Sequence, residues 1–264
     1  MSKAWVNVFN RLGIALTVVL PFILLATGWQ LLVAYGSFPA KLVPDLRVVA
    51  EALLRLTENG VLIAAVGATL FRLAMGFLLA ALFGVVIGVL MGRHQWIEET
   101  LLPLVSFLYP IPGIAYAPLF VLWFGLGDTP AILLVAVAST FVVIINSWKG
   151  VAAVKPIWIK SAESMGAQGL NMFWKVIVPG ALPYILTGLR LGLATAWRIL
   201  VAVEMLMSVK RGLGWLIFGS QEFLNTDIML ATIAVIGLIG LVLEKLVFEK
   251  IERVTVVRWG MLTA

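Results

Sequence analysis

Long apolar runs alternate with short polar segments along the whole chain. A helix needs about 20 apolar residues to cross the hydrocarbon core of a bilayer, and several runs reach or approach this length. The predicted spans cover residues 12–35, 61–91, 101–124, 130–148, 181–208 and 228–247. The pattern therefore predicts an all-α membrane protein with six transmembrane helices, in a single transmembrane domain that covers residues 1–264.

Two polar segments interrupt the apolar pattern in different ways. Residues 41–58 mix charged and apolar positions, which predicts a short amphipathic helix outside the membrane core. Residues 154–179 form a polar, glycine-containing island between two predicted spans. The island is either an interfacial helix lying on lipid or an element that docks into a groove on a cytoplasmic partner.

The island has room for two short helices. Pro156 suits the first turn of a helix, and Gly166 and Gly169 interrupt the apolar spacing that follows it. A second helix is predicted over 170–178, with its apolar residues on one side. The following prolines, Pro179 and Pro183, are expected to end that helix and lead into the fifth span.

Composition supports a lipid environment and excludes several kinds of site. Hydrophobic residues make up 62% of the chain and charged residues 12%, far from the balance of a soluble domain. The chain has no cysteine and a single histidine, so we predict no catalytic residues and no cysteine or multi-histidine metal site. It also lacks the phosphate-binding pattern GxxxxGK[ST], so we expect no ATP hydrolysis by this chain itself.

The net charge of +6 fits a membrane protein better than a nucleic-acid-binding one. Lysines and arginines gather at the ends of the apolar runs, where they orient membrane spans. Most of them fall on one side of the membrane if both termini are cytoplasmic. We therefore expect a multi-pass protein with cytoplasmic N- and C-termini, a cytoplasmic island and no nucleic-acid partner.

Glycines in the second and fifth spans predict close helix packing. Gly84, Gly88 and Gly92 fall on one helix face at four-residue spacing, which lets another helix approach closely. Gly188 and Gly192 have the same spacing in the fifth span.

Charged residues lie well inside predicted spans at Arg72, Arg190, Arg198 and Glu204. Charges are costly there and usually face a bundle interior or water. Each arginine is interpreted either as a solute contact on the translocation path or as a structural residue near a span end. Glu204 could pair with an arginine on another helix.

The third span contains three prolines, Pro110, Pro112 and Pro118, which are expected to bend or break the helix. Backbone groups freed in this way are tolerated at membrane depth only beside protein or water. The stretch from Tyr109 to Pro118, which includes Tyr116, is therefore predicted to face the translocation path or a dimer seam. A kink needed only for packing is the alternative.

The island resembles the coupling loop, or EAA loop, of ABC importer permeases. The family pattern is Glu-Ala-Ala, three residues, Gly, nine residues, Ile, one residue and Leu-Pro. Here Ala162, Gly166 and Pro179 match it, with Val176 and Val178 at the Ile and Leu positions. The chain departs from the pattern at two positions, because it has Lys160 for the glutamate and Ser161 for the first alanine.

Other stretches extend the likeness over most of the chain, from about residue 42 to 257. LLPLVSFLYPIPGIAYAPLFVLWFGLGD, ALPYILTGLRLGLATAWRILVAVEML and GLGWLIFGSQEFLNTD are similar to permeases that import nitrate, sulfonates and taurine. The resemblance implies a type I ABC importer fold in a bacterial inner membrane. It also implies a homodimeric permease, two ATP-binding cassette subunits that bind the ATP and magnesium, and an extracytoplasmic solute-binding protein. The ATPase contacts it implies are Ser161, Ala162, Glu163, Gly166, Ala167 and Phe173.

Two other functions are weighed against an ATP-driven importer. A secondary transporter or channel working without ATP would need a relay of carboxylates within the spans, and Glu204 is the one acidic residue predicted well inside a span. An intramembrane enzyme would need a cluster of reactive side chains, which the sequence lacks.

Overall fold

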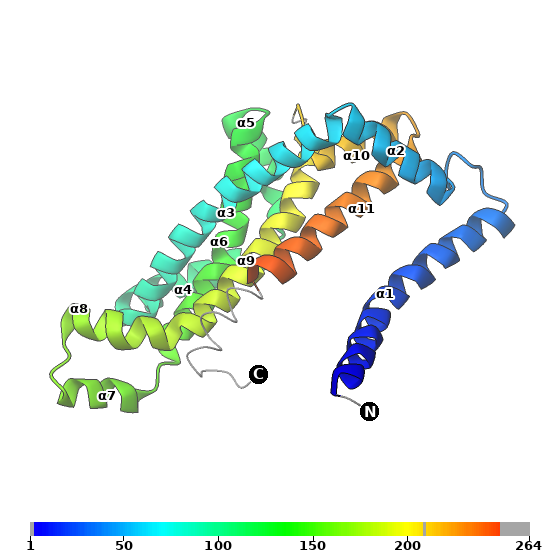
Figure 1. The fold of residues 1–264 in the computed structure, drawn as a ribbon. Helices are drawn as coiled ribbons and strands as arrows, with labels where there is room; N and C mark the ends of the chain where they lie inside the picture. Colours follow the sequence, from blue (N-terminus) through cyan, green and yellow to red (C-terminus); the bar gives the residue numbers. More distant parts are fainter. Residues whose placement is uncertain (1–2, 208–209, 249–264) are drawn as a thin grey trace.

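The computed structural model describes residues 3–207 and 210–248, and every regular element within those ranges is helical (Figure 1). The elements are α1 (Lys3–Tyr35), α2 (Leu46–Glu58), α3 (Val61–Arg93), α4 (Gln95–Leu108), η1 (Gly113–Tyr116), α5 (Ala117–Phe124), α6 (Asp128–Ala152), α7 (Pro156–Ser164), α8 (Gly169–Met172), η2 (Phe173–Ile177), α9 (Val178–Leu206), α10 (Leu213–Glu222), α11 (Thr226–Val242) and η3 (Leu243–Phe248). The predicted all-α class is confirmed for these residues.

Four helical stretches in the described part are long and apolar enough to cross a membrane. They are Val61–Arg93, Asp128–Ala152, Gly169–Leu206 and Thr226–Lys245. A bent pair, formed by α4 with the η1–α5 segment, would make a fifth, and Val19–Tyr35 is a shorter apolar stretch within α1. The count of six spans therefore stays a prediction.

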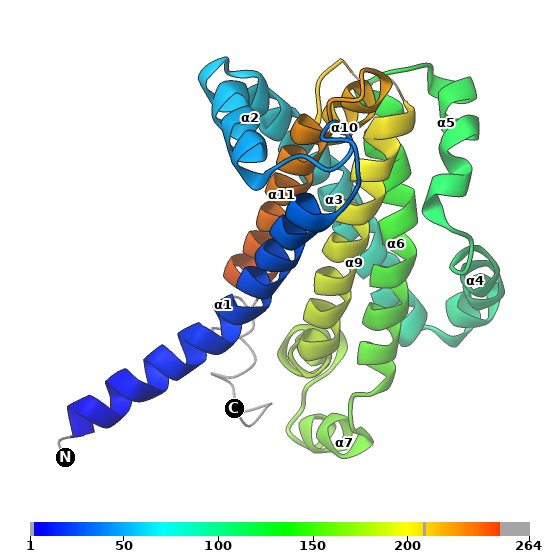
Figure 2. The ribbon, with the colours of Figure 1, turned by 90° about the vertical axis from the view of Figure 1, so that its right-hand side faces the viewer.

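Helices α3, α6 and α9 form the centre of the bundle (Figure 2). The predicted glycine face on α3 is confirmed, because a Cβ built at Gly88 would lie 2.5 Å from the Ile144 carbonyl oxygen and one at Gly92 would lie 2.5 Å from Val151 Cβ. Gly192 of α9 approaches α6 in the same way, with its Cβ position 2.7 Å from Val143 Cγ2. Because glycine has no side chain, the three helix backbones pack directly against one another at these positions.

The third apolar run is not one straight helix. The axis turns by 89° between α4 and the η1–α5 segment. Pro110 and Pro112 lie in the break, where each lacks the N–H that would continue the helical hydrogen bonds. Pro118 lies in the first turn of α5, a position that needs no such donor. The expected break is confirmed, and it falls at the first two prolines.

The island differs from its prediction in its second half. Helix α7 begins at Pro156, and Gly166 and Gly169 follow it with positive φ, as expected. The prediction that Pro179 and Pro183 end a separate helix is wrong, because α8, η2 and α9 run on as one helical stretch, Gly169–Leu206. A proline ring clashes with the carbonyl four residues earlier. For Pro179 that residue is Lys175, which lies in the widened π-helical turn η2 and so leaves room for the ring.

The end of the bundle opposite α7 carries α2, α10 and the start of α11, drawn at the top in Figures 1 and 2. The predicted amphipathic helix is α2, and Asp45 caps its N-terminus by accepting a hydrogen bond from the Arg47 N–H at 2.7 Å. Arg55 of α2 pairs with Asp227 of α11 at 3.1 Å. Helix α1 stands apart from the bundle in Figure 1. The charged tail after residue 248 lies outside the described residues.

Candidate functional site

The turn between α7 and α8 is built by a pattern of backbone hydrogen bonds at the end of α7. The Gly166 N–H donates to the Glu163 carbonyl at 2.9 Å, and the Ala167 N–H donates to the Ala162 carbonyl at 2.9 Å. Gly166 has φ +84°, the left-handed conformation that glycine adopts without strain. These bonds form a Schellman motif, and Ala162 and Ala167 both pack against one buried apolar cluster. The four-residue spacing from Ala162 to Gly166 is therefore the spacing that this C-terminal helix cap requires.

The coupling segment, residues 156–177, is anchored by one side and exposed on the other. Met172 and Ile177 are buried in a cluster with Val154 and Ala181, and Phe173 packs against that cluster. Ser161 and Glu163 are exposed. Large apolar side chains are exposed beside them, namely Ile157, Trp158, Met165, Leu170 and Trp174. Water disfavours such a patch on a free surface, so this arrangement fits a partner protein or lipid.

The broken third run places its predicted site residues in two environments. Tyr109, Pro110, Pro112 and Pro118 are exposed. Tyr116 packs against the cluster of Ala117 and Phe120, and its hydroxyl is buried without a hydrogen-bond partner among the described residues. A Cβ at Gly113 would lie 2.7 Å from Ile199 Cδ1. This contact fixes the broken segment against α9, next to Arg198.

Glu204 is fully buried near the end of α9, and three groups form hydrogen bonds with its carboxylate. Arg72 of α3 donates to Oε1 at 2.5 Å, and the Thr69 hydroxyl lies 2.9 and 3.0 Å from the two carboxylate oxygens. The Gly214 N–H donates to Oε2 at 3.0 Å. The expected pairing of Glu204 with an arginine on another helix is confirmed, and Arg72 is that arginine.

Arg72 also holds two loops at the same end of the bundle. It donates to Asp128 Oδ1 at 2.8 Å, at the start of α6, and to the Arg211 carbonyl oxygen at 2.6 Å. The Leu213 N–H donates to the Thr69 hydroxyl at 2.9 Å. The arginine is therefore a structural residue in this state, since its guanidinium is buried and its hydrogen bonds go to protein groups. We call Thr69, Arg72, Asp128 and Glu204 the polar network.

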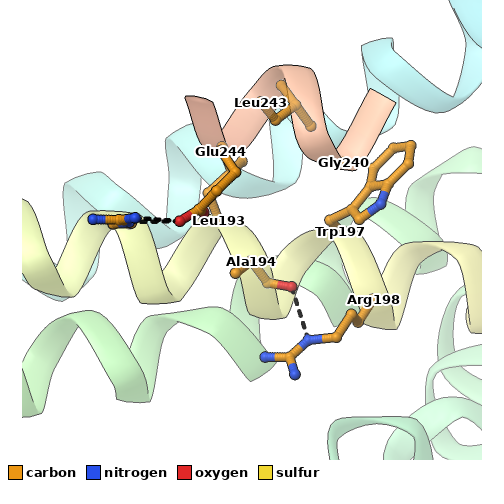
Figure 3. A pocket seen from close by; sticks show the side chains of 8 residues that line it. Leu193, Ala194, Trp197, Arg198, Gly240, Leu243 and Glu244 are labelled. Carbon is orange, nitrogen blue, oxygen red and sulfur yellow. Dashed lines mark hydrogen bonds and ion pairs between the residues drawn. The ribbon is translucent and has the colours of Figure 1, made fainter. Parts of the chain in front are cut away.

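Arg190 and Arg198 line one small cavity between α9 and the α11–η3 helix (Figure 3). Arg190 Nε donates to Glu244 Oε1 at 2.9 Å. Arg198 Nε donates to the backbone oxygen of Ala194 at 3.1 Å. The other predicted path residues, Tyr109 to Pro118, do not line this cavity, although Gly113 contacts α9 one residue from Arg198.

Sequence reasoning missed Asp128 and Glu244 as members of these charged groups. Both are acidic residues near the end of an apolar run, whereas Glu204 drew attention because it lies well inside one. In the described part of the chain, no group of three or more His, Asp or Glu side chains could hold a metal ion.

Comparisons with known proteins agree with this architecture. Residues 80–248 match the family model described as binding-protein-dependent transport system inner membrane component. The taurine transport system permease protein TauC of Escherichia coli (strain K12) is 38% identical over 226 residues, which cover 84% of this chain and 82% of TauC. SsuC of Bacillus subtilis (strain 168), by name an aliphatic sulfonates transport permease, is 33% identical over 88% of this chain and 83% of its own length.

A solved structure supports the fold independently. A chain of the inward-facing MetNI methionine ABC transporter aligns with a TM-score of 0.60 and 20% identity, covering 74% of this chain and 97% of that one. At this identity the likeness concerns the fold alone. Together with the family match over most of the membrane bundle, these findings show that the chain belongs to the binding-protein-dependent transport system inner membrane components, the permease subunits of ABC importers.

Proposed function

We propose that two copies of this chain form the membrane channel of an importer for a small organic or inorganic anion. In this arrangement α1 supplies the sixth span, both termini are cytoplasmic, and the coupling segment faces the cytoplasm. Two ATPase subunits would bind there, and a solute-binding protein would deliver the solute at the opposite end, which carries α2 and α10. The solute class is proposed because TauC is by name a taurine permease and SsuC a sulfonates permease.

The observation that carries the proposal is the shape of the coupling segment. Its turn is fixed by the Schellman motif, its base is anchored by Met172 and Ile177, and its apolar face is exposed. A rigid helix pair with an apolar face can fill a groove on another protein and pass on its motion. Because α8 continues without interruption into α9, force on the segment acts directly on a membrane-spanning helix.

The path is proposed to follow one face of α9. Tyr184, Thr187, Leu191 and Arg198 are exposed at helical spacing along it. Polar side chains on the outside of a spanning helix are costly in lipid, so such a face is expected to border water or a second protein chain. The broken segment meets α9 at Ile199, beside this face, which supports its assignment to the same path or seam.

The acidic residues give no support to transport without ATP. The Glu204 carboxylate is bonded to Arg72, Thr69 and Gly214, so it is occupied by protein partners. Glu244 is bonded to Arg190. A proton or sodium relay would need a carboxylate free to exchange its partner, and these two are engaged in ion pairs.

Co-purification tests the proposal. The tagged chain is purified from its host in mild detergent, and the proteins bound to it are identified by mass spectrometry. We expect a stoichiometric ATPase subunit that is lost from the Gly166→Val variant, since a β-branched residue at φ +84° strains the turn by about 1–2 kcal/mol.

Gly60→Val is the matched control. Gly60 has a similar φ of +71°, and nothing lies within 4 Å of the Cβ position at either glycine. Gly60 lies at the opposite end of the bundle. The proposal requires the ATPase to remain bound to the Gly60 variant. A chain that purifies alone, or one that loses the ATPase equally in both variants, would refute the coupling assignment.

A further inference from the structure

Helix α7 presents a lysine next to the exposed apolar surface of the coupling segment. One side of α7 is turned toward the bundle, because Ile159 and Ala162 pack against the buried cluster at the base of the segment. Ile157 and Lys160 lie away from that side, three residues apart, a spacing at which helical side chains are neighbours. Ile157 is 63% exposed, and Lys160 is exposed beside it. A protein that covers the apolar surface would therefore also cover the lysine.

The charges of this part of the chain do not cancel. Residues 155–177 hold three lysines and one glutamate, so their net charge is +2. The four charged residues are Lys155, Lys160, Glu163 and Lys175, and all of them are exposed. Lys160 and Glu163 are close along α7, yet neither forms an ion pair with any residue that the structure describes. The ammonium group of Lys160 is thus available to a group outside the described chain.

Lys155 differs from Lys160 in having a contact within the chain. Its ammonium nitrogen lies 5.6 Å from the centre of the Trp158 ring, which is a cation–π distance. Within residues 3–207 and 210–248, Lys160 has neither an aromatic ring nor a carboxylate as its partner. On α7, Lys160 is therefore the lysine whose charge is left for a binding partner.

We infer that the ATPase groove that receives the coupling segment has a carboxylate that pairs with Lys160. A lysine ammonium is a compact charge with three donors, which suits a carboxylate at the rim of an apolar groove. Complementary charges across an interface favour the correct partner and speed association. The charge is opposite in sign to the glutamate at this place in the EAA-loop pattern. The inference rests on the proposed function and adds to it the charge of the ATPase surface.

Carbodiimide cross-linking tests the contact directly. The reagent joins a lysine amine to a carboxylate in contact with it, as an amide, and takes up the water that is lost. We expect mass spectrometry of the treated permease–ATPase complex to find the Lys160 peptide joined to an Asp or Glu peptide of the ATPase. Lys160→Arg keeps the positive charge but has no amine for this reaction. It should therefore retain the ATPase and lose the cross-link.

Charge reversal tests whether the pair contributes to binding. Lys160→Glu should weaken ATPase binding by about tenfold or more, because an attraction becomes a repulsion. Replacing the cross-linked carboxylate of the ATPase with lysine should restore binding to this variant. Arg93→Glu is the control, since Arg93 is exposed at the end of α3. Its neighbour Gly92 packs against Val151, which places it at the same end of the bundle. This control should retain the ATPase.

The possible results separate the inference from the proposed function. If the ATPase binds equally to the native chain and to Lys160→Glu, the inference is overturned and the coupling contact stands. An equal loss in Lys160→Glu and Arg93→Glu, or a loss seen only in nanodiscs of anionic lipid, would assign the lysine to the membrane surface and also overturn it. A native chain that binds no ATPase would instead refute the proposed function itself.

Discussion

The two ends of the bundle differ in which energetically costly groups they contain: one end has buried charged side chains, and the other has exposed apolar side chains. At the α10 end, an arginine and a glutamate are buried, and their hydrogen bonds are made to groups of α3, α6, α9, α10 and the loop before α10. At the α7 end, large apolar side chains of the coupling segment remain exposed. The buried charges of the first end find their partners within the chain, whereas the exposed apolar face of the coupling segment would be covered by a partner.

This difference predicts where mutations act. Changes in the polar network should reduce the stability of the isolated chain, because a buried charge would lose its partner. Changes on the exposed apolar face should leave stability alone and weaken assembly. The predictions below are ordered from the largest expected effect to the smallest.

Arg72→Leu should have the largest effect on stability. It leaves the Glu204 carboxylate buried without its counter-charge, at a cost of about 3–5 kcal/mol. Thermal unfolding in detergent and the yield of folded protein measure this loss. The double variant Arg72→Leu/Glu204→Gln should recover most of the stability, since the remaining amide still accepts from Thr69 and Gly214.

Asp128→Asn provides the internal comparison. Asp128 also bonds Arg72, but its side chain is 59% exposed, so its loss should cost about 1 kcal/mol or less. A double variant no more stable than Arg72→Leu, or an Asp128 effect as large as that of Arg72, would contradict the role given to the buried pair.

Gly88→Ala should destabilise the helix bundle by about 1–3 kcal/mol. The new methyl group would lie 2.5 Å from the Ile144 carbonyl oxygen, so α3 and α6 must move apart. Gly67→Ala in the same helix is the control, because nothing lies within 4 Å of its Cβ position. That change should be neutral or slightly stabilising in the same unfolding assay. Equal effects at both positions would mean that close packing at Gly88 contributes little.

Leu170→Ser should leave unfolding within about 0.5 kcal/mol of the native value, as is usual for exposed positions, and should reduce the amount of ATPase bound. Phe223→Ser is the control at the opposite end, since both side chains are 76% exposed. Quantitative co-purification should show a loss of ATPase in the first variant alone. If neither variant lost ATPase, Leu170 would not be part of the contact with the ATPase.

The smallest effect is expected at the N-terminal cap of α2. The hydrogen bond from the Arg47 N–H, and then that from Gln30, lower the pKa of Asp45 below its ordinary value of 3.8. The carboxylate therefore stabilises α2 fully above pH 3.8, and this contribution is lost as the pH falls through the lower folded-state pKa. The protection of the first amides of α2 against hydrogen exchange, relative to the intrinsic exchange rate at each pH, should fall on acidification in the native chain. In Asp45→Asn, which keeps a capping oxygen without a titrating group, this fall should disappear.

The sequence was most informative where a feature depends on local geometry. Gly84, Gly88 and Gly92 predicted a packing face, because helical periodicity alone places them together. Pro110 and Pro112 predicted the break in the third run, since the missing donor is a property of the residue itself. Gly166 and Gly169 predicted the interruption after the first helix of the coupling segment, and the structure has both residues at positive φ there.

The sequence was least informative where distant segments meet. Glu204 was expected to pair with an arginine, but that arginine, Arg72, is 132 positions away in the chain. Arg72 also donates to the Arg211 carbonyl oxygen, a backbone group that no sequence pattern could identify. The Arg190–Glu244 pair joins two helices whose relative placement no local pattern determines. Pro179 was misread because a π-helical turn ahead of it relieves the clash that normally ends a helix.

The uninterrupted helix from the coupling segment to the polar network has a mechanical consequence. Its 38 residues span about 57 Å at 1.5 Å per residue. Gly169 at one end adjoins the exposed turn, and Glu204 near the other end accepts a hydrogen bond from the backbone of the first turn of α10. Such a rod acts as a lever: each degree of tilt about its lower end displaces its upper end by about 1 Å. A small rotation imposed by an ATPase would thus shift the far loop at the same instant, and no intermediate joint would be needed to relay it.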